Sequence, residues 1–417
     1  MARVLFSTFG SFGDLHPYLA IGAELQKLGH RAVIATSAGY RKKIEAEGLG
    51  FAPIRPDVSL DDTETIQYFF DRRRGTERVI KAMLSVLRET YEDTLQAAKD
   101  AHCIVTHPLS FAAVIAAQKR KLPWVSSVLA PGSFLSAYEP PVPAPMPWLV
   151  KFRALGPAAM RAAWGMVTPM IRSWCKPVFE LRRDLGLDPG GNPLFEGGNS
   201  PDLVLALFSH VFAQAQPDWP RQTLTTGFPF HDHPGVGLPR ELVSFLDAGP
   251  PPAVFTLGSS AVAAAGDFYS ISVRAIQRAG ARALFLTGSQ PQGLPSKLPE
   301  NVLIWPYAPH EQLFCRASAI VHQGGIGTTA QALRSGRPML VIPFAHDQYD
   351  NAARVQRIGA GISIPRNRYA EARGADALAH LLSDRSYTAA AAEAGRAIRA
   401  EHGAQTAAQA IERYVSQ

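Results

Sequence analysis

A glycine-rich turn between two short apolar runs constrains the fold of this chain more than any other feature. Residues 318–321 form the first run, and residues 339–343 form the second. Between the runs, residues 328–335 have the composition of a helix, and Gly336 follows where a helix commonly ends. The glycines of the turn are Gly324, Gly325 and Gly327. Strand, turn, helix and strand in this order predict a unit of a parallel sheet.

This turn favours anion binding, because glycine lets the backbone approach a phosphate and the first N–H groups of the helix point at it. His322 and Thr328 can add side-chain donors. Glycine-rich turns also occur without a ligand, so the turn alone is a weak indication. Asp347 and Gln348 follow the second run, and a carboxylate beside an amide there suits the paired hydroxyls of a sugar. Together these features predict a nucleotide-sugar site.

Residues 322–351, with Tyr-Ala-Pro-His at 307–310, resemble the donor-site signature of family 1 glycosyltransferases. The resemblance is strongest to the bacterial sterol, macrolide and rhamnosyltransferase types. It implies an α/β protein of GT-B fold, with two Rossmann-like domains facing a cleft. It also implies inverting, metal-independent sugar transfer from a nucleoside diphosphate. The donor contacts that it implies are Ser259, Tyr307, His310, His322, Gly324, Gly325, Gly327, Thr328, Asp347 and Gln348.

The chain has 417 residues, which is too long for one ordinary core and indicates two domains. We expect an N-terminal acceptor-binding domain over residues 1–216 and a linker over 217–239, where Pro, Gly and His are frequent. A nucleotide-sugar-binding domain follows over residues 240–395. The resemblance implies that a last helix, 396–417, returns to the N-terminal domain. Residues 51–71 are polar and irregular, and no element is predicted there.

The resemblance places the catalytic base in the loop after the first predicted strand. Most members have His where this chain has Asp14, although sterol and glycopeptide types have Asp, and His16 is a second candidate. A carboxylate near a helix start is stabilised as the anion, whereas a His is better matched to general-base work near neutral pH. Either side chain could simply cap the helix. Because His107 stands where many members have an Asp that orients a catalytic His, we predict Asp14 as the base.

Acceptor contacts are predicted from Phe12, His107, Tyr138 and Trp148. The last two flank a proline-rich stretch that can be neither helix nor central strand, and that resembles the acceptor-lining loop of the family. His107 could instead be a structural histidine. Residues 149–185 predict one or two amphipathic helices that pack over the acceptor site, and peripheral contact with a membrane surface is the alternative.

Composition excludes several classes of protein. The net charge is +7, but no dense basic run with interleaved aromatic residues predicts nucleic-acid binding. The three cysteines lie far apart, which predicts neither a metal site nor a disulfide framework and fits a reducing cytoplasm. The sequence shows no signal peptide and no apolar run long enough to span a membrane.

We therefore predict a glycosyltransferase that moves glucose from UDP-glucose to a hydroxyl of a small lipophilic or phenolic acceptor, without a metal or another cofactor. The alternative donor is dTDP-rhamnose, because residues 344–352, FAHDQYDNA, resemble rhamnosyltransferases. A nucleotide-sugar-binding protein without catalysis is a rival that Asp14 and His16 disfavour. An NAD-dependent oxidoreductase is disfavoured because the glycine fingerprint with an acidic ribose contact is missing.

Overall fold

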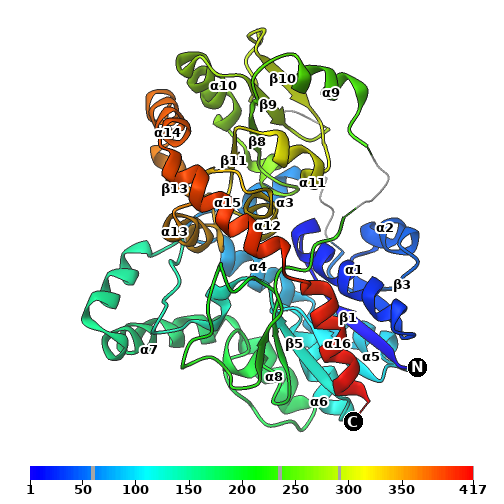
Figure 1. Cartoon of the computed structure of the whole chain (residues 1–417). Helices are drawn as coiled ribbons and strands as arrows, with labels where there is room; N and C mark the ends of the chain where they lie inside the picture. Colours follow the sequence, from blue (N-terminus) through cyan, green and yellow to red (C-terminus); the bar gives the residue numbers. More distant parts are fainter. Residues whose placement is uncertain (58–61, 233–236, 290–292, 417) are drawn as a thin grey trace. The chain divides into compact units, whose positions relative to one another are not determined.

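The computed structural model describes residues 1–57, 62–232, 237–289 and 293–416, which form two compact units (Figure 1). Unit 1 comprises Met1–Asp62, Arg74–His231 and Glu401–Gln417. Unit 2 comprises Asp232–Ala400 together with the short segment Thr63–Arg73.

Unit 1 is built on a parallel sheet whose strand order, within the described residues, is β3-β2-β1-β4-β5-β6-β7. The central strand β1 lies between β2 and β4, with Leu5 opposite Val33 and Ile104, and all three side chains are buried. The strand order reverses between β1 and β4, where open parallel sheets bind ligands. The strands are β1 (Arg3–Ser7), β2 (Arg31–Thr36), β3 (Gly50–Pro53), β4 (Cys103–Thr106), β5 (Trp124–Val128), β6 (Val204–Ala206) and β7 (Thr223–Thr225).

Helices cover this sheet, and the C-terminal helix α16 packs against α1 within the same unit. The Tyr414 hydroxyl on α16 donates to Asp202 Oδ2 at 2.8 Å, and His30 Nε2 lies 3.5 Å from Glu412 Oε1. The helices are α1 (Phe12–Lys27), α2 (Arg41–Ala46), α4 (Gly75–Ser85), α5 (Leu87–Ala97), α6 (Phe111–Arg120), α7 (Pro157–Trp174), α8 (Lys176–Asp184) and α16 (Gly403–Val415).

Unit 2 repeats this plan with a second parallel sheet, of order β10-β9-β8-β11-β12-β13 in the described part. Its order reverses between β8 and β11. The strands are β8 (Ala253–Thr256), β9 (Ala283–Leu286), β10 (Val302–Trp305), β11 (Ala319–His322), β12 (Met339–Val341) and β13 (Gly361–Ser363). The helices are α3 (Thr63–Phe69), α9 (Arg240–Asp247), α10 (Phe268–Ala279), α11 (His310–Leu313), α12 (Ile326–Ser335), α13 (Gln348–Ile358), α14 (Glu371–Ser383) and α15 (Arg385–Arg399).

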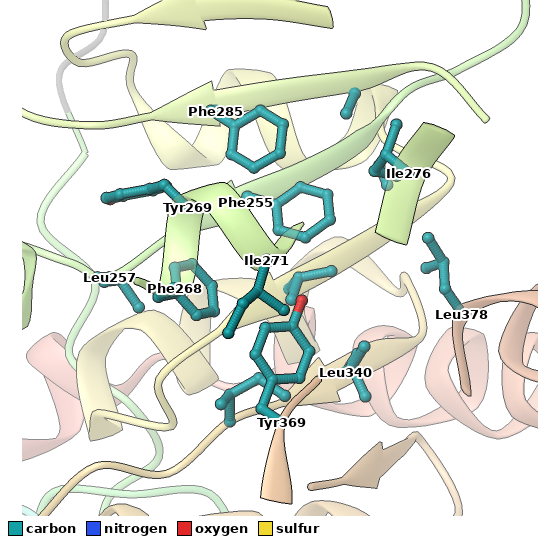
Figure 2. Close-up of a cluster of buried hydrophobic side chains, with 14 of the residues drawn as sticks. Phe255, Leu257, Phe268, Tyr269, Ile271, Ile276, Phe285, Leu340, Tyr369 and Leu378 are labelled. Atoms are coloured by element: carbon teal, nitrogen blue, oxygen red, sulfur yellow. The ribbon is translucent and has the colours of Figure 1, made fainter. Parts of the chain in front are cut away.

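Aromatic side chains fill the core of unit 2 on one side of its sheet (Figure 2). Phe255 on β8 stacks on Phe285 of β9, with ring centroids 4.4 Å apart, and Phe268 stacks on Tyr369 at 5.6 Å. Apolar burial of this extent is the main stabilising term of such a domain. It fixes the strand ends from which the loops of the site emerge.

Two stretches hold elements that the sequence did not predict. Residues 51–71, expected to be irregular, contain the last residues of β3 and the helix α3. The stretch 217–239, expected as a linker, contains the edge strand β7, which is only three residues long and too short to give a pattern. Residues 58–61 and 233–236 of these stretches lie outside the described residues. Among the residues described, no helix is long and apolar enough to cross a membrane.

Candidate active site

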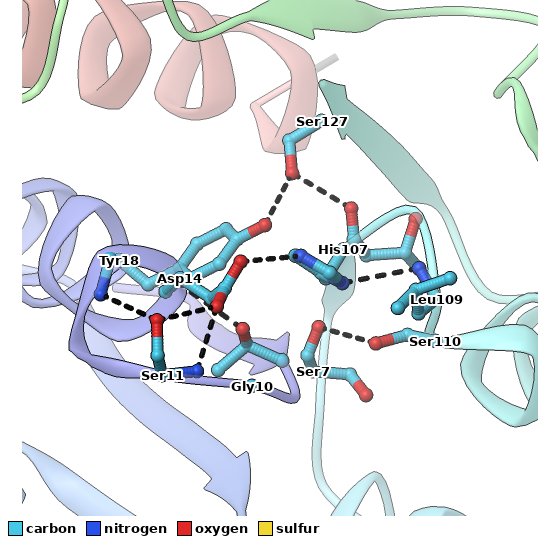
Figure 3. A network of polar contacts seen from close by, with 12 residues as sticks. Ser7, Gly10, Ser11, Asp14, Tyr18, His107, Leu109, Ser110 and Ser127 are labelled. Atoms are coloured by element: carbon cyan, nitrogen blue, oxygen red, sulfur yellow. Dashed lines mark hydrogen bonds and ion pairs between the residues drawn. The ribbon is translucent and has the colours of Figure 1, made fainter. Parts of the chain in front are cut away.

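Asp14 lies in the first turn of α1, and its carboxylate bends back over the turn that precedes the helix (Figure 3). Its Oδ2 accepts hydrogen bonds from the Ser11 backbone N–H at 2.7 Å and from the Ser11 hydroxyl at 3.1 Å. The Ser11 hydroxyl oxygen accepts from the Gly13 N–H at 3.1 Å, which completes a capping box. Gly10 has φ +125°, and a Cβ there would lie 2.3 Å from Asp14 Oδ2. The turn is therefore shaped around this carboxylate.

The second oxygen of Asp14 contacts His107. This histidine directly follows β4, the strand next to β1 at the switch point. The His107 Nε2 atom lies 3.3 Å from Asp14 Oδ1. The Leu109 N–H donates to His107 Nδ1 at 3.1 Å, so in a neutral ring the proton is on Nε2 and points at Asp14. His107 is buried, at 7% exposure, whereas the Asp14 side chain is 31% exposed. The pair is thus a partly exposed carboxylate in contact with a buried histidine.

His16 contacts a different set of residues from Asp14. Its ring stacks on Phe12 at a centroid distance of 5.4 Å and lies 5.3 Å from the ring of His231. His231 Nε2 in turn lies 3.1 Å from Glu47 Oε1. Phe12 also contacts Tyr40, whose hydroxyl donates to the Gly10 carbonyl oxygen at 2.7 Å. The structure therefore brings Phe12 and His16 together and brings Asp14 and His107 together, as two separate pairs at the start of α1.

A small pocket lies at the carboxyl ends of β1 and β4, and neither Asp14 nor His107 is among the residues that line it. Its wall includes Thr8, Phe9, Met83, Leu109 and Ser110. The Ser110 hydroxyl donates to the Ser7 carbonyl oxygen at 2.8 Å, which fixes the loop after β4 to the end of β1. The wall is mostly apolar, but the cavity of about 10 Å³ has room for about one water molecule and not for an acceptor with a ring system.

Tyr138 and Trp148 belong to a separate part of unit 1. The loop that carries them is anchored by Asp218, which accepts from the Ser136 hydroxyl and the Ala137 N–H, both at 2.7 Å. The Arg161 guanidinium donates to the Tyr138 hydroxyl at 3.1 Å. Trp148 is 52% exposed and contacts Phe152 at a ring distance of 6.4 Å.

In unit 2, the predicted glycine turn joins β11 to α12 at the switch point of the sheet. Gly324 has φ +89°, and a Cβ there would lie 2.8 Å from Val341 Cγ1 and 3.0 Å from the Gln348 carbonyl oxygen, so only glycine fits without a shift. Gly325 is the N-cap residue of α12 and provides no side-chain cap. The first N–H groups of α12 are thus left for another acceptor, and the helix dipole favours an anion there.

The loop after β8 lies against this turn. Gly258 has φ +66°, and a Cβ there would lie 2.7 Å from Gln323 Nε2 and 3.3 Å from Thr328 Oγ1. Ser259 follows Gly258 directly, so its hydroxyl and backbone are carried on the same loop. Gln323 is buried next to Gly325 as well, and it was not among the residues predicted from the sequence. Gln323 could have been predicted as a site residue from its position between His322 and Gly324 in the HQGG motif.

His322 is fully buried at the end of β11. Its Nδ1 accepts from the Gly324 N–H at 3.1 Å, so the neutral ring carries its proton on Nε2. Nε2 has no hydrogen-bond partner among the described residues. Burial lowers the pKa of His322 to about 3, with a further contribution from His310 nearby. The ring is therefore a neutral donor whose buried N–H fits an oxygen of an anion bound at the turn.

His310 and Tyr307 lie on the loop between β10 and α11. His310 stacks on Phe314 at a centroid distance of 4.3 Å, and burial lowers its pKa to about 4. The Tyr307 ring is 61% exposed and lies 6.3 Å from the ring of His310. Tyr307 thus offers an open aromatic face of the kind on which a nucleobase stacks.

The loop after β12 is held to the glycine turn through Asn351. Gln348 Oε1 accepts from the backbone N–H groups of Phe344 at 2.8 Å and Ala345 at 3.1 Å, so this oxygen is used inside the loop. Asp347 Oδ2 accepts from Asn351 Nδ2 at 2.7 Å. Asn351 Nδ2 also donates to the Gly324 carbonyl oxygen at 2.9 Å. Asn351 was not predicted as a site residue, although its position four residues after Asp347 on a helix gave a signal.

The helix α3 also contacts this region, which the sequence did not indicate. The Phe70 ring lies 5.3 Å from the ring of His346, which has φ +55° and precedes Asp347. Gln67 Nε2 donates at 3.0 Å to the carbonyl oxygen of Ala263, in the short helix η5 (Ala261–Ala264) that follows the β8 loop. Segment 63–73 therefore touches both loops that flank the glycine turn.

The described residues contain no group of three or more His, Cys, Asp or Glu side chains arranged to hold a metal ion. The groups that the glycine turn offers to an anion are backbone N–H groups and uncharged side-chain donors.

Comparison with known proteins decides the family. Residues 4–126 match the glycosyltransferase family 28 N-terminal domain, and residues 284–413 match the erythromycin biosynthesis protein CIII-like C-terminal domain. The O-mycaminosyltylonolide 6-deoxyallosyltransferase of Streptomyces fradiae is 30% identical over 435 residues, which cover 99% of this chain and 97% of that protein. The chain is a family 1 glycosyltransferase. The family and the enzyme class that the sequence predicted are confirmed.

Other relatives of this glycosyltransferase are sterol 3-beta-glucosyltransferases. The protein of Leptosphaeria maculans is 27% identical over 434 residues, and the match covers 97% of this chain but only 28% of that longer protein. Among solved structures, the glycotransferase of kitacinnamycin has a TM-score of 0.70 at 20% identity, with 99% of each chain covered. The glycosyltransferase VinC in complex with dTDP has a TM-score of 0.71 at 20% identity, again with 99% of each chain covered. The predicted GT-B fold is confirmed.

Proposed function

We propose that this glycosyltransferase moves a hexose from a nucleoside diphosphate sugar to a hydroxyl of a small lipophilic or phenolic acceptor, with inversion and without a metal ion. The contact between Asp14 Oδ1 and His107 Nε2, at 3.3 Å, carries this proposal. It gives a partly exposed carboxylate a fixed direction at the switch point of unit 1, where a base would have to meet the acceptor hydroxyl.

The chemistry follows from the two oxygens of Asp14. Oδ2 accepts two hydrogen bonds from Ser11, whereas Oδ1 meets His107. The remaining lone pair of Oδ1 accepts the proton of the acceptor hydroxyl while that oxygen attacks the anomeric carbon. The bond from the anomeric carbon to the diphosphate oxygen breaks, and its electron pair leaves with the diphosphate. Attack from the face opposite the leaving group inverts the anomeric configuration.

The donor groups of unit 2 suit the leaving diphosphate. Its developing charge is met by the uncapped N–H groups at the start of α12 and by the buried Nε2–H of His322. Ser259 and Thr328 add hydroxyl donors from the loops that meet at Gly258. The exposed ring of Tyr307 stacks on the nucleobase, and Asp347 and Gln348 bind the sugar. Excess EDTA should leave most activity in place, and a loss that only added Mn²⁺ restores would contradict metal independence.

The acceptor class is supported by the relatives. These are named for O-mycaminosyltylonolide and for sterols, and a sterol is a lipophilic alcohol. Unit 1 would hold the acceptor against Phe12.

Glucose from UDP-glucose is the proposed donor, in line with the sterol 3-beta-glucosyltransferases. A 6-deoxyhexose such as rhamnose, from its dTDP derivative, is the second candidate. It is favoured by the sequence FAHDQYDNA around Asp347 and by the name of the Streptomyces fradiae relative, a 6-deoxyallosyltransferase.

A donor panel tests this function. The enzyme is incubated with UDP-glucose or dTDP-rhamnose and with a phenolic or a sterol acceptor, and the products are identified by mass spectrometry, with Asp14→Asn as the control. Transfer by the wild type alone supports the proposal, and the anomeric configuration of the product reports inversion. Tight binding of a nucleotide sugar in calorimetry without transfer to any acceptor would instead favour a binding protein.

A further inference from the structure

Unit 1 carries a segment whose solvent side is apolar. The segment consists of a 3₁₀ helix, η3 (Pro147–Leu155), and the helix α7 that follows it. Its exposed large apolar side chains are Trp148 at 52%, Leu155 at 73%, Met166 at 70% and Met170 at 48% exposure. Figure 1 shows α7 at the margin of unit 1.

The inner side of α7 is buried by packing within unit 1. Met160, Ala163 and Trp164 are buried in a cluster with Ala137 and Leu149. A surface helix ordinarily turns polar side chains to solvent on its other side. Here the exposed positions between Ala158 and Met170 are mostly apolar, namely Ala158, Ala162, Gly165, Met166, Pro169 and Met170. The helix is therefore apolar on both sides, but only the inner side packs against unit 1.

The charges of this segment all have the same sign. Residues 147–174 contain no Asp or Glu, and their four charged side chains, all exposed, are Lys151, Arg153, Arg161 and Arg172. Cationic side chains around an exposed apolar surface complement the anionic headgroups and acyl chains of a lipid bilayer. Trp148 adds an aromatic ring of the kind that settles at the boundary between headgroups and acyl chains.

We propose that η3 and α7 form a membrane-binding surface for anionic lipid bilayers, with α7 lying in the plane of the interface. A second copy of this chain fits the surface less well, because a symmetric contact would place the same four positive charges against each other. The proposal does not depend on which sugar or acceptor the enzyme uses.

Vesicle cosedimentation of the full chain tests the apolar part of this surface. We expect binding to vesicles of equal parts phosphatidylglycerol and phosphatidylcholine, and much weaker binding to phosphatidylcholine alone. The variant M166Q/M170Q should need about tenfold more anionic lipid for half-maximal binding. The matched control, L28Q/L382Q, changes two leucines of 38% and 40% exposure outside the segment and should bind as the wild type does.

A second pair of variants tests the charges. K151Q/R153Q should weaken binding to the anionic vesicles by about tenfold or more, since each basic residue near such a surface contributes about fivefold. R368Q/R373Q removes two exposed charges from unit 2 and should have little effect. Circular dichroism and thermal melting of each variant separate lost binding from lost folding.

Three outcomes would overturn the proposal. These are no binding to anionic vesicles, equal binding by M166Q/M170Q and L28Q/L382Q, and self-association in light scattering that only M166Q/M170Q abolishes. The last would assign the surface to a second copy of the chain.

Discussion

The side-chain amide of Asn351 donates to the Gly324 carbonyl oxygen at 2.9 Å and so ties helix α13 to the glycine turn. The same nitrogen donates to Asp347 Oδ2 at 2.7 Å. One fully buried side chain therefore holds the turn proposed to bind the diphosphate and the loop proposed to bind the sugar in a fixed relation.

Asn351→Ala should weaken nucleotide-sugar binding although Asn351 itself is shielded from the ligand. The change leaves the Gly324 carbonyl and the Asp347 carboxylate without this donor, which should cost about 1–3 kcal/mol of unfolding free energy. Calorimetry with UDP-glucose should show reduced affinity. Asn301→Ala is the control, because Asn301 also bonds a backbone oxygen of unit 2, that of Ala281. It should lose stability and keep its affinity, and equal affinity losses in both variants would contradict the role of Asn351.

Gly324→Ala should destabilise the turn by more than the strain of its positive φ alone would. A Cβ at this position meets Val341 Cγ1 at 2.8 Å, in addition to the strain of φ +89°. Gly336, at the other end of α12, has φ +71° but more room, with its nearest atom 3.4 Å away. Gly336→Ala should therefore cost about 1–2 kcal/mol and keep nucleotide binding. Gly324→Ala should cost more in urea denaturation and lose UDP binding; unchanged UDP affinity would show that the turn does not hold the diphosphate.

Local sequence patterns were sufficient to predict the strand–turn–helix–strand segment around the glycine turn. The apolar runs, the turn glycines and Gly336 each impose a backbone conformation on their immediate neighbours, and β11, α12 and β12 follow from them. The prediction of this segment needed only residues close together in the chain. Asp14 was predicted as the base from the family resemblance, because it stands in the loop where the family has its base and His107 stands where many members have an Asp.

Features that depend on distant residues could not be predicted in the same way. Segment 63–73 belongs to unit 2, where Phe70 lies near His346, a residue far from it in the chain. From the sequence, His107 could contact the acceptor, contact the base or be purely structural. Only the order of β1 and β4 in the sheet shows that it lies beside Asp14. His322 could be named from its motif, but its burial follows from the strands on both sides of β11.

Two histidines of unit 2, the fully buried His322 and the partly exposed His310, predict a loss of stability in acid. Burial lowers the pKa of His322 to about 3 and that of His310 to about 4, whereas a histidine in the unfolded chain titrates near about 6.5. As the pH falls below the unfolded value, the unfolded chain binds more protons than the folded one, so the unfolding free energy decreases. Above that value both states are neutral and the effect vanishes.

His322→Gln should therefore flatten this dependence. Each such histidine contributes a slope of at most about 1.4 kcal/mol per pH unit. Urea denaturation between about pH 7.5 and about pH 5 should show a smaller decrease for His322→Gln than for the wild type. His380→Gln replaces an exposed histidine and should keep the wild-type slope. Identical slopes for all three proteins would mean that folding does not lower the pKa of His322.

Phe70→Ala should affect the sugar more than the nucleotide. Phe70 supports His346, whose backbone at φ +55° directly precedes Asp347. Loss of the aromatic contact, about 0.5–1.5 kcal/mol, should weaken UDP-glucose binding about two- to tenfold and leave UDP affinity nearly unchanged. Tyr68→Ala removes a 55% exposed tyrosine from α3, the helix that precedes Phe70, and should change neither affinity. A parallel loss for UDP and UDP-glucose would remove Phe70 from the support of the sugar loop.

The role of Asp14 as the base is tested most directly by the transfer rate and the UDP-glucose affinity of Asp14→Asn, measured beside those of His16→Ala. General-base catalysis typically contributes about 100- to 10,000-fold, so Asp14→Asn should lose turnover on that scale and still bind the donor. His16→Ala should lose less, because His16 stacks on Phe12 and lies near the His231 ring, whereas the partners of Asp14 are Ser11 and His107. Normal turnover by Asp14→Asn together with an inactive His16→Ala would contradict the account and identify His16 as the base.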